Sequence, residues 1–115
     1  MSVAASVVVR AQTAARDERS QFRFEFAQAR SLRGLGVEGW AYNDLPWRVT
    51  NVRLQVDCLD EGGTVTESAS GWVNGNVSAG GRAYFFVAVA KPAATYRVSV
   101  QSFDKIAREA PTQAP

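Results

Sequence analysis

The sequence contains no histidine, and Cys58 is its only cysteine among 115 residues. Without histidine, the chain alone cannot assemble a Ser-His-Asp triad, a Cys-His dyad or a mixed Cys/His zinc site. A single cysteine excludes a disulfide within the chain, and it is compatible with both a reducing cytosol and an oxidising periplasm. We therefore expect a protein that is not an enzyme and that uses no metal ion or cofactor.

Long apolar runs and a strong excess of one charge are also missing. No apolar stretch approaches the ~20 residues that a membrane-spanning helix needs, so we expect no direct insertion into a membrane. Residues 1–9 are apolar but lack a basic start, which favours a terminal strand or a disordered leader over a signal peptide. Thirteen basic and eleven acidic residues leave a net charge of +2, and this small excess gives little support to nucleic-acid binding.

The length and the composition, 46% hydrophobic and 21% charged, fit one globular domain. Residues 1–20 are rich in Ala, Val and Ser without a sustained apolar period, and we predict a partly flexible N-terminal segment there. Residues 108–115 contain two prolines and no large apolar side chain, which predicts a disordered C-terminal tail. The remaining residues, 21–107, form the predicted domain.

Two stretches of this domain alternate in the manner of half-buried strands. Residues 21–26 alternate aromatic and charged side chains, which places Phe22, Phe24 and Phe26 on one face. Residues 52–58 alternate in the same way. Their inward side chains are expected to be Val52, Leu54, Val56 and Cys58, and their outward ones Arg53, Gln55 and Asp57. The glycines in the turn at residues 60–63 then predict a hairpin.

Further strands are predicted at residues 37–42, 64–73, 82–90 and 96–103, with turns between them and no convincing amphipathic helix. This pattern predicts an all-β fold, an antiparallel immunoglobulin-like β-sandwich of about seven strands, with a small β-barrel as the alternative. In such a sandwich Phe24, Leu54 and Val98 share one interior.

Three stretches in the middle of the chain resemble the sequence pattern of a known domain family. They are Gly-Trp-Ala-Tyr-Asn at 39–43, Thr-Asn-Val-Arg-Leu-Gln-Val at 50–56, and Val-Ser-Ala-Gly-Gly-Arg at 77–82 before Tyr-Phe-Phe at 84–86. Residues 37–103 thereby resemble the FxLYD-type domain, a bacterial and archaeal β-sandwich module of immunoglobulin-like character. The resemblance implies a cell-envelope or secreted protein and no catalytic residues.

The namesake motif of that family is altered in this chain. Val56, Cys58 and Leu59 stand where Phe, Leu and Tyr are usual, and only Asp60 is kept. Each substitution preserves an apolar residue at an inward or strand-end position, so the altered motif is compatible with the same architecture. The resemblance is therefore to a remote relative.

Residues 34–39 match the pattern G-x-G-x-x-G, which in dinucleotide-binding proteins leads into a helix. Here the following residues are strand-like, and Pro46 ends any helix within two turns. We therefore predict no cofactor site. Instead, Gly34 and Gly36 are expected to form a turn, and Gly39 to allow a neighbour to approach the strand closely.

Three aromatic residues form the candidate interaction patch: Trp40, Tyr42 and Trp47. If small side chains at 37, 39 and 41 face the core, Trp40 and Tyr42 share the opposite face with Glu38, and Trp47 follows just beyond the turn. Two alternatives stay open at this point. The aromatic side chains could form the core while the small residues face outward, or the N-terminal segment could cover the patch.

Other candidate sites have simpler interpretations. Cys58 is in phase with the inward residues of its strand, which indicates a buried apolar residue and not a nucleophile. Asp57, Asp60 and Glu61 fit no calcium-binding spacing, and a solvated hairpin turn explains them. No serine is placed beside either lysine, Lys91 or Lys105, for a Ser-Lys dyad.

The functional prediction is a non-enzymatic module that contacts another protein through a sheet face or an edge strand, in a bacterial envelope or exported protein. The alternative is a carbohydrate- or small-ligand-binding module in which Trp40, Tyr42 and Trp47 stack on sugar rings. The sequence leaves the partner, the compartment and the oligomeric state open.

Overall fold

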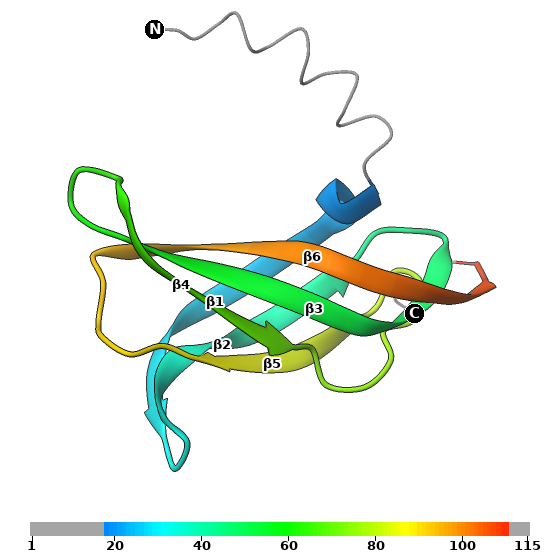
Figure 1. The fold of residues 1–115 in the computed structure, drawn as a ribbon. Helices are drawn as coiled ribbons and strands as arrows, with labels where there is room; N and C mark the ends of the chain where they lie inside the picture. Colours follow the sequence, from blue (N-terminus) through cyan, green and yellow to red (C-terminus); the bar gives the residue numbers. More distant parts are fainter. Residues whose placement is uncertain (1–17, 111–115) are drawn as a thin grey trace, which may run out of the picture.

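The computed structural model of the chain describes residues 18–110, which fold into two antiparallel sheets of three strands each (Figure 1). The elements in chain order are the 3-10 turn η1 (Glu18–Gln21) and the strands β1 (Phe22–Ser31), β2 (Gly34–Asn43), β3 (Trp47–Leu59), β4 (Val65–Trp72), β5 (Arg82–Ala88) and β6 (Thr95–Arg108). Sheet A has the order β1-β2-β5 and sheet B the order β4-β3-β6. The sheets pack face to face without closing into a barrel, so the predicted β-sandwich is confirmed.

The described residues hold six strands, one fewer than the predicted seven. The strand or leader expected at residues 1–9 lies outside the described residues, as do most of the predicted N-terminal segment and residues 111–115 of the predicted tail. The strand-forming part of the chain is slightly longer than predicted, since β6 ends at Arg108. Glu109 continues the ordered contacts, because its amide N donates to the carbonyl O of Pro46 at 3.0 Å.

The core lies between the inner faces of the two sheets. From β3 it receives the four side chains that the alternation predicts, and Val52, Leu54, Val56 and Cys58 are all buried. Sheet A contributes Val37, Ala41 and Phe85 from the opposite side. Phe24 and Val98 pack against the same cluster as Leu54, so the prediction of one shared interior is confirmed.

The two sheets are joined along one border, where β4 lies beside β5. Val73 and Phe85 form an isolated antiparallel bridge there, and the amide N of Asn74 donates to the carbonyl O of Tyr84 at 3.0 Å. On the opposite border, β1 and β6 meet through side chains, as in the edge-to-face contact of Phe22 with Phe103 at 5.4 Å between ring centroids.

Tight turns connect the paired strands. The β1–β2 hairpin turns over two residues, Leu32 and Arg33, before Gly34, whose φ of 97° lies in the region that favours glycine. The predicted hairpin at residues 60–63 is also confirmed. One carboxylate oxygen of Asp60 accepts from the amide N of Gly62 and of Thr64, both at 2.9 Å, which stabilises this turn.

The glycine predictions are confirmed at two positions and wrong at one. Gly34 lies at the turn, but Gly36 is within β2, where a Cβ atom would lie 2.4 Å from the ring of Phe86. Gly39 does allow a close neighbour, because a Cβ atom there would lie 1.8 Å from the carbonyl O of Glu25. All three glycines belong to β2, so the helix that a dinucleotide site requires does not follow them.

Candidate interaction face

The outward side chains of sheet A form one continuous surface, which we call the aromatic face. The register of β1, β2 and β5 places them in cross-strand rows. Its members are Arg23, Glu25, Glu38, Trp40, Tyr42, Arg82, Tyr84 and Phe86. In β2 the alternation is as predicted, because Val37 and Ala41 are fully buried and Trp40 between them is 37% exposed. The alternative with the aromatic side chains of β2 in the core is therefore wrong.

Trp40 lies at the centre of the aromatic face, on the middle strand of sheet A. Its neighbour in the register is Tyr84 on β5, and the two rings meet edge to face with centroids 6.1 Å apart. The guanidinium carbon of Arg82 lies 4.1 Å from the centroid of the Trp40 ring, which is a cation–π contact. Trp40 is thus both exposed and held in place.

Tyr42 is fixed by charged neighbours on both sides. Its hydroxyl group donates to Oε1 of Glu25 at 2.5 Å and accepts from Nη1 of Arg82 at 3.3 Å. The guanidinium group of Arg23 lies 4.8 Å from the ring centroid, and Nε of Arg23 donates to Oδ2 of Asp44 at 2.6 Å. These contacts leave the Tyr42 ring with little rotational freedom.

The remaining aromatic side chains of the face are held in the same manner. The hydroxyl group of Tyr84 donates to Oε1 of Glu38 at 2.7 Å, and this hydrogen bond is the main reason that the pKa of Tyr84 is raised. Phe86 lies beneath Arg33, whose guanidinium carbon is 4.4 Å from the ring centroid. Acidic and arginine side chains therefore surround the aromatic rings of the face.

Trp47 does not join Trp40 and Tyr42. It is the first residue of β3 in sheet B, and its side chain packs against the core cluster. The ammonium N of Lys105 lies 4.8 Å from its ring centroid and the guanidinium carbon of Arg108 lies 5.7 Å away. The structure thus brings together two of the three predicted patch residues and adds Arg82, Tyr84 and Phe86 from β5. No alternation places these three on the face, because residues 83–87 are all apolar or aromatic. The pairing of β5 with β2 brings them there.

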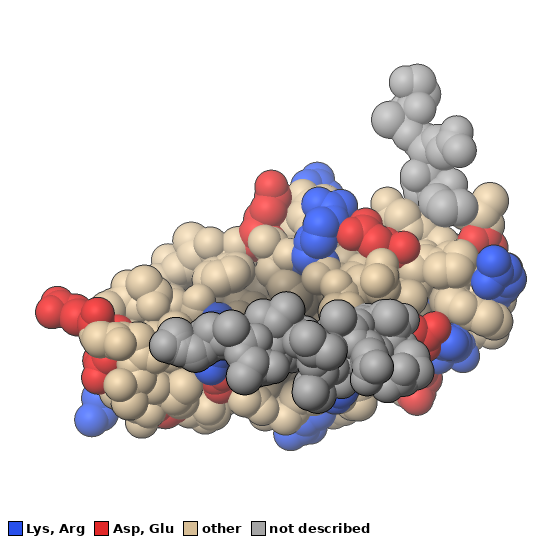
Figure 2. Space-filling view, turned by 90° about the horizontal axis from the view of Figure 1, so that it is seen from above, with Lys and Arg blue, Asp and Glu red and all other residues tan. Residues whose placement is uncertain are grey.

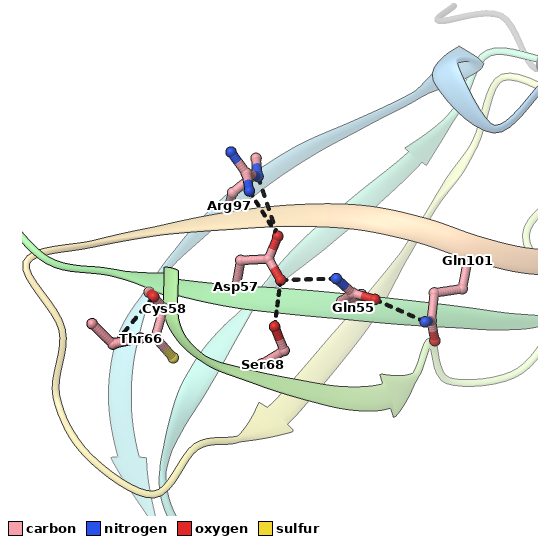
Figure 3. Close-up of polar contacts among 7 residues, drawn as sticks. All are labelled: Gln55, Asp57, Cys58, Thr66, Ser68, Arg97 and Gln101. Carbon is pink, nitrogen blue, oxygen red and sulfur yellow. Dashed lines mark hydrogen bonds and ion pairs between the residues drawn. The ribbon is translucent and has the colours of Figure 1, made fainter. Parts of the chain in front are cut away.

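The outer face of sheet B carries a polar network around Asp57 (Figure 3). Sequence alternation places this side chain toward water, but it is only 7% exposed. Its Oδ1 accepts from Ser68 at 2.7 Å and from Gln55 at 2.8 Å, while its Oδ2 accepts from Nη2 of Arg97 at 3.0 Å. The prediction of a water-facing Asp57 is wrong because neighbours from β4 and β6 cover the carboxylate.

These hydrogen bonds make the stability of the protein depend on pH. They lower the pKa of Asp57, with Ser68 as the largest cause, Gln55 next and Arg97 adding to both, against the opposing effect of burial. A lowered pKa in the folded state gives stability that is present above the unfolded value of about 4 and lost as the pH falls below it. We expect Asp57→Asn to lower the free energy of unfolding by about 1 kcal/mol at pH 7.

Urea unfolding at several pH values measures this effect. The difference between the wild type and Asp57→Asn should shrink steadily between about pH 5 and pH 2. Glu61→Gln is the matched control, since Glu61 is exposed in the turn between β3 and β4. Parallel curves for the wild type and Asp57→Asn over this range would contradict the assignment.

The remaining candidates show no catalytic arrangement in the described residues. Cys58 is buried, and burial raises the pKa of its thiol, which keeps the sulfur protonated and unreactive. Lys91 lines a cavity of about 280 Å³ together with Cys58, Thr66, Glu67 and Pro92, none of which is a serine. Between residues 18 and 110, no three acidic or cysteine side chains gather in an arrangement that could hold a metal ion.

No family model, curated protein or solved structure matches this chain. The resemblance to the FxLYD-type domain therefore stays a prediction. In the part of the chain that the structure describes, no helix has the length and apolar character to cross a membrane.

Proposed function

We propose that this chain is a non-enzymatic β-sandwich interaction module that contacts another protein through the aromatic face. The observation that carries the proposal is the position of Trp40, exposed at the centre of the face between Arg82 and Tyr84. Trp, Tyr and Arg are the residue types that dominate the energetic centres of protein interfaces. A sheet surface with these side chains suits a protein partner with a complementary surface.

The fixed geometry of the face supports the same function. Each polar group of Tyr42 and Tyr84 already has a partner within the face, so binding costs little additional side-chain entropy. The arginines and glutamates around the rings supply a polar rim that interfaces of this kind require. Figure 2 shows acidic and basic residues interspersed over the visible surface of the molecule, without a large area of one sign. This mixture favours a protein partner over nucleic acid.

The cellular setting is part of the proposal. The stretches at residues 39–43, 50–56 and 77–82 that resemble the FxLYD-type domain favour an immunoglobulin-like module in a bacterial envelope or exported protein. The two packed antiparallel sheets are compatible with that class. Export would be tested directly by fractionating cells that express the full gene and following the chain with an antibody.

The proposal predicts that Trp40→Ala weakens binding to the partner by at least tenfold, which corresponds to about 1.4 kcal/mol. A tagged chain retains partners from an envelope extract, and titration calorimetry then measures the affinity of the purified partner for each variant. Trp72→Ala is the matched control, because Trp72 is 53% exposed on the outer face of sheet B and also lies under an arginine, Arg53, at 5.2 Å.

Two outcomes would contradict the proposal. In one, Trp40→Ala retains the affinity of the wild type while Trp72→Ala loses it, which would move the interaction to sheet B. In the other, both variants bind as tightly as the wild type, which would remove the exposed tryptophans from the interface.

Carbohydrate binding by Trp40, Tyr42 and Trp47 is the alternative, and it has weaker support. Stacking on a sugar ring needs a free aromatic surface, but Arg82 lies over the ring of Trp40 and Trp47 packs against the core from the other sheet. Loss of glycan-array binding on Trp40→Ala would favour the alternative.

A further inference from the structure

Strand β1 presents a long and regular free edge. It pairs with β2 over ten consecutive residue pairs without a bulge, and within residues 18–110 no strand pairs with its other side. Free edges are usually protected by proline, lysine, a bulge or a covering segment, because their unpaired amide and carbonyl groups accept another strand. The sequence of β1 contains no proline, glycine or lysine.

The direction of the backbone groups identifies which residues present the free edge. The amide N of Asp44 donates to the carbonyl O of Gln21 at 2.9 Å, and Gln21 precedes β1 in the same regular register with β2. Since the direction alternates along an antiparallel strand, Arg23 and Glu25 point their backbone groups to β2. Phe22, Phe24 and Phe26 therefore point theirs to the free edge.

The inward side of this edge carries phenylalanine side chains and is incompletely filled. Phe22 and Phe24 line a cavity of about 300 Å³ with Val98 and Val100 of β6 and with the polar residues Arg19, Ser20 and Ser99. Phe26 lies beside a second cavity, of about 530 Å³, and is 38% exposed. A strand that pairs with β1 and carries large apolar side chains at alternate positions would cover Phe26 and fill this space.

We propose that the occupant of this edge is β1 of a second copy of the chain, paired antiparallel about a two-fold axis at Phe24. Phe24 then lies opposite Phe24 of the second copy, and Phe22 lies opposite Phe26. On the outer face, Arg23 lies opposite Glu25 of the second copy, twice in each dimer. The two copies of sheet A join into one six-stranded sheet.

Charge selects this register from the other two-fold registers of β1. When two copies of β1 pair antiparallel about a two-fold axis, opposed residues lie on the same face of the sheet. Because side chains alternate between the faces, the numbers of two opposed residues are either both odd or both even. An axis at Arg23 or at Glu25 sets like charges opposite each other, and an axis at Phe26 sets both charges opposite alanine. Within β1, only the axis at Phe24 opposes an acidic and a basic side chain.

The side chains of Arg23 and Glu25 can form the ion pairs that this register requires. Arg23 bonds Asp44 and Glu25 accepts from Tyr42, but a guanidinium group has five donors and a carboxylate about four acceptor positions. Both residues occupy the non-hydrogen-bonded positions of the new pair, where opposed side chains come closest. The 3-10 turn η1 lies against β6, where Glu18 bonds Lys105 at 2.9 Å, and it precedes the residues of β1 that would pair.

Sedimentation equilibrium of the full 115-residue chain and its charge variants tests the proposal. The wild type should dimerise, and Arg23→Glu and Glu25→Arg should each raise the dissociation constant by roughly tenfold, because each sets like charges opposite each other twice. The double variant with both exchanges should return to within about threefold of the wild type. Arg30→Glu is the matched control, as it makes the same change of charge on β1 outside the paired residues.

A disulfide trap tests the register without relying on charge. Opposed non-hydrogen-bonded residues have Cα atoms about 4.5 Å apart, within the range that a disulfide spans. A mixture of Arg23→Cys and Glu25→Cys should form a mixed disulfide dimer under diamide, at least tenfold more than either variant alone. The natural Cys58 is buried and does not interfere.

The proposal is overturned if the wild type is monomeric up to about 1 mM, or if the single charge variants dimerise as well as Arg30→Glu does. It is also overturned if each cysteine variant crosslinks with itself as readily as with the other. Circular dichroism of each variant establishes that it is folded. If one of the single charge variants does not fold, the double variant still tests the charge pairing. Failure here leaves the proposed use of the aromatic face intact, because Trp40 lies on β2 and not at this edge.

Discussion

Replacing Asn43 by aspartate should lower the free energy of unfolding by about 3 kcal/mol or more at pH 7. Asn43 is fully buried at the end of β2. Its side-chain Nδ2 donates to the carbonyl O of Trp47 at 2.7 Å and lies 3.2 Å from those of Val77 and Ser78, while its Oδ1 accepts from the amide N of Leu45 at 3.0 Å. Aspartate would direct a carboxylate oxygen at these three carbonyl oxygens, which it repels, although those of Val77 and Ser78 also accept from the backbone amides of Val49 and Gly81.

The loss should also depend on pH. Burial and the facing carbonyl groups raise the pKa of the introduced carboxyl group, because only its protonated form can donate a hydrogen bond. A raised pKa in the folded state gives stability that is present below the unfolded value of about 4 and lost as the pH rises through the folded value. The free energy of unfolding of the variant should therefore be closest to that of the wild type near pH 4. Guanidinium unfolding of both proteins at pH 4 and at pH 7 measures this difference.

Asn76→Asp serves as the control for this variant, since Asn76 is exposed in the loop before β5. It should change the free energy of unfolding by less than about 0.5 kcal/mol. An Asn43→Asp protein as stable as this control at pH 7 would show that the three carbonyl groups do not depend on Asn43.

Replacing Gly39 by alanine is the second change with a large expected effect. The added Cβ atom would lie 1.8 Å from the carbonyl O of Glu25 and 2.7 Å from Cα of Phe26. Both are backbone atoms of β1, so no side-chain rotation relieves the contact, and β1 has to move away from β2. We expect a loss of roughly 3 kcal/mol in the free energy of unfolding.

Thermal unfolding and amide hydrogen exchange measure this second effect. The protection of amides in β1 and β2 should fall more than that in sheet B, because the pairing of these two strands is what the methyl group disturbs. Gly62→Ala is the control, since its Cβ atom would meet only a carboxylate oxygen of Asp60, at the ordinary contact distance of 3.5 Å. Equal melting temperatures for the two variants would contradict the close approach of β1 to Gly39.

Side-chain alternation was sufficient to predict the parts of the fold in which pairing is regular. In β3, the predicted inward residues from Val52 to Cys58 are all buried, and in β2 the opposite orientations of Val37 and Trp40 are as predicted. Trp47 could not be placed in this way. The pairing of β3 with β6 shifts register between Thr50 and Arg53, so the alternation downstream does not extend back to Trp47.

The contacts that complete the candidate site could not be predicted because they join residues distant in the sequence. Asp57 is covered by Ser68 and Arg97 from two other strands, 11 and 40 residues away. Trp40 meets Arg82 and Tyr84 only because β5 pairs with β2, which alternation within either strand does not reveal. Local pattern thus determines which way a side chain points, and strand pairing determines what it meets.

The border of the sandwich at which β4 lies beside β5 should open less readily than the opposite border, between β1 and β6. Main-chain hydrogen bonding links the sheets at Asn74 and Tyr84, whereas the border between β1 and β6 relies on ring contact and a few flexible side chains. Thermal fluctuations should therefore separate the sheets at β1 and β6 while the border between β4 and β5 stays closed. Such openings would expose the phenylalanines of β1 for short periods. A native protein that opens in this way is most vulnerable to proteases and to misassembly along a single border.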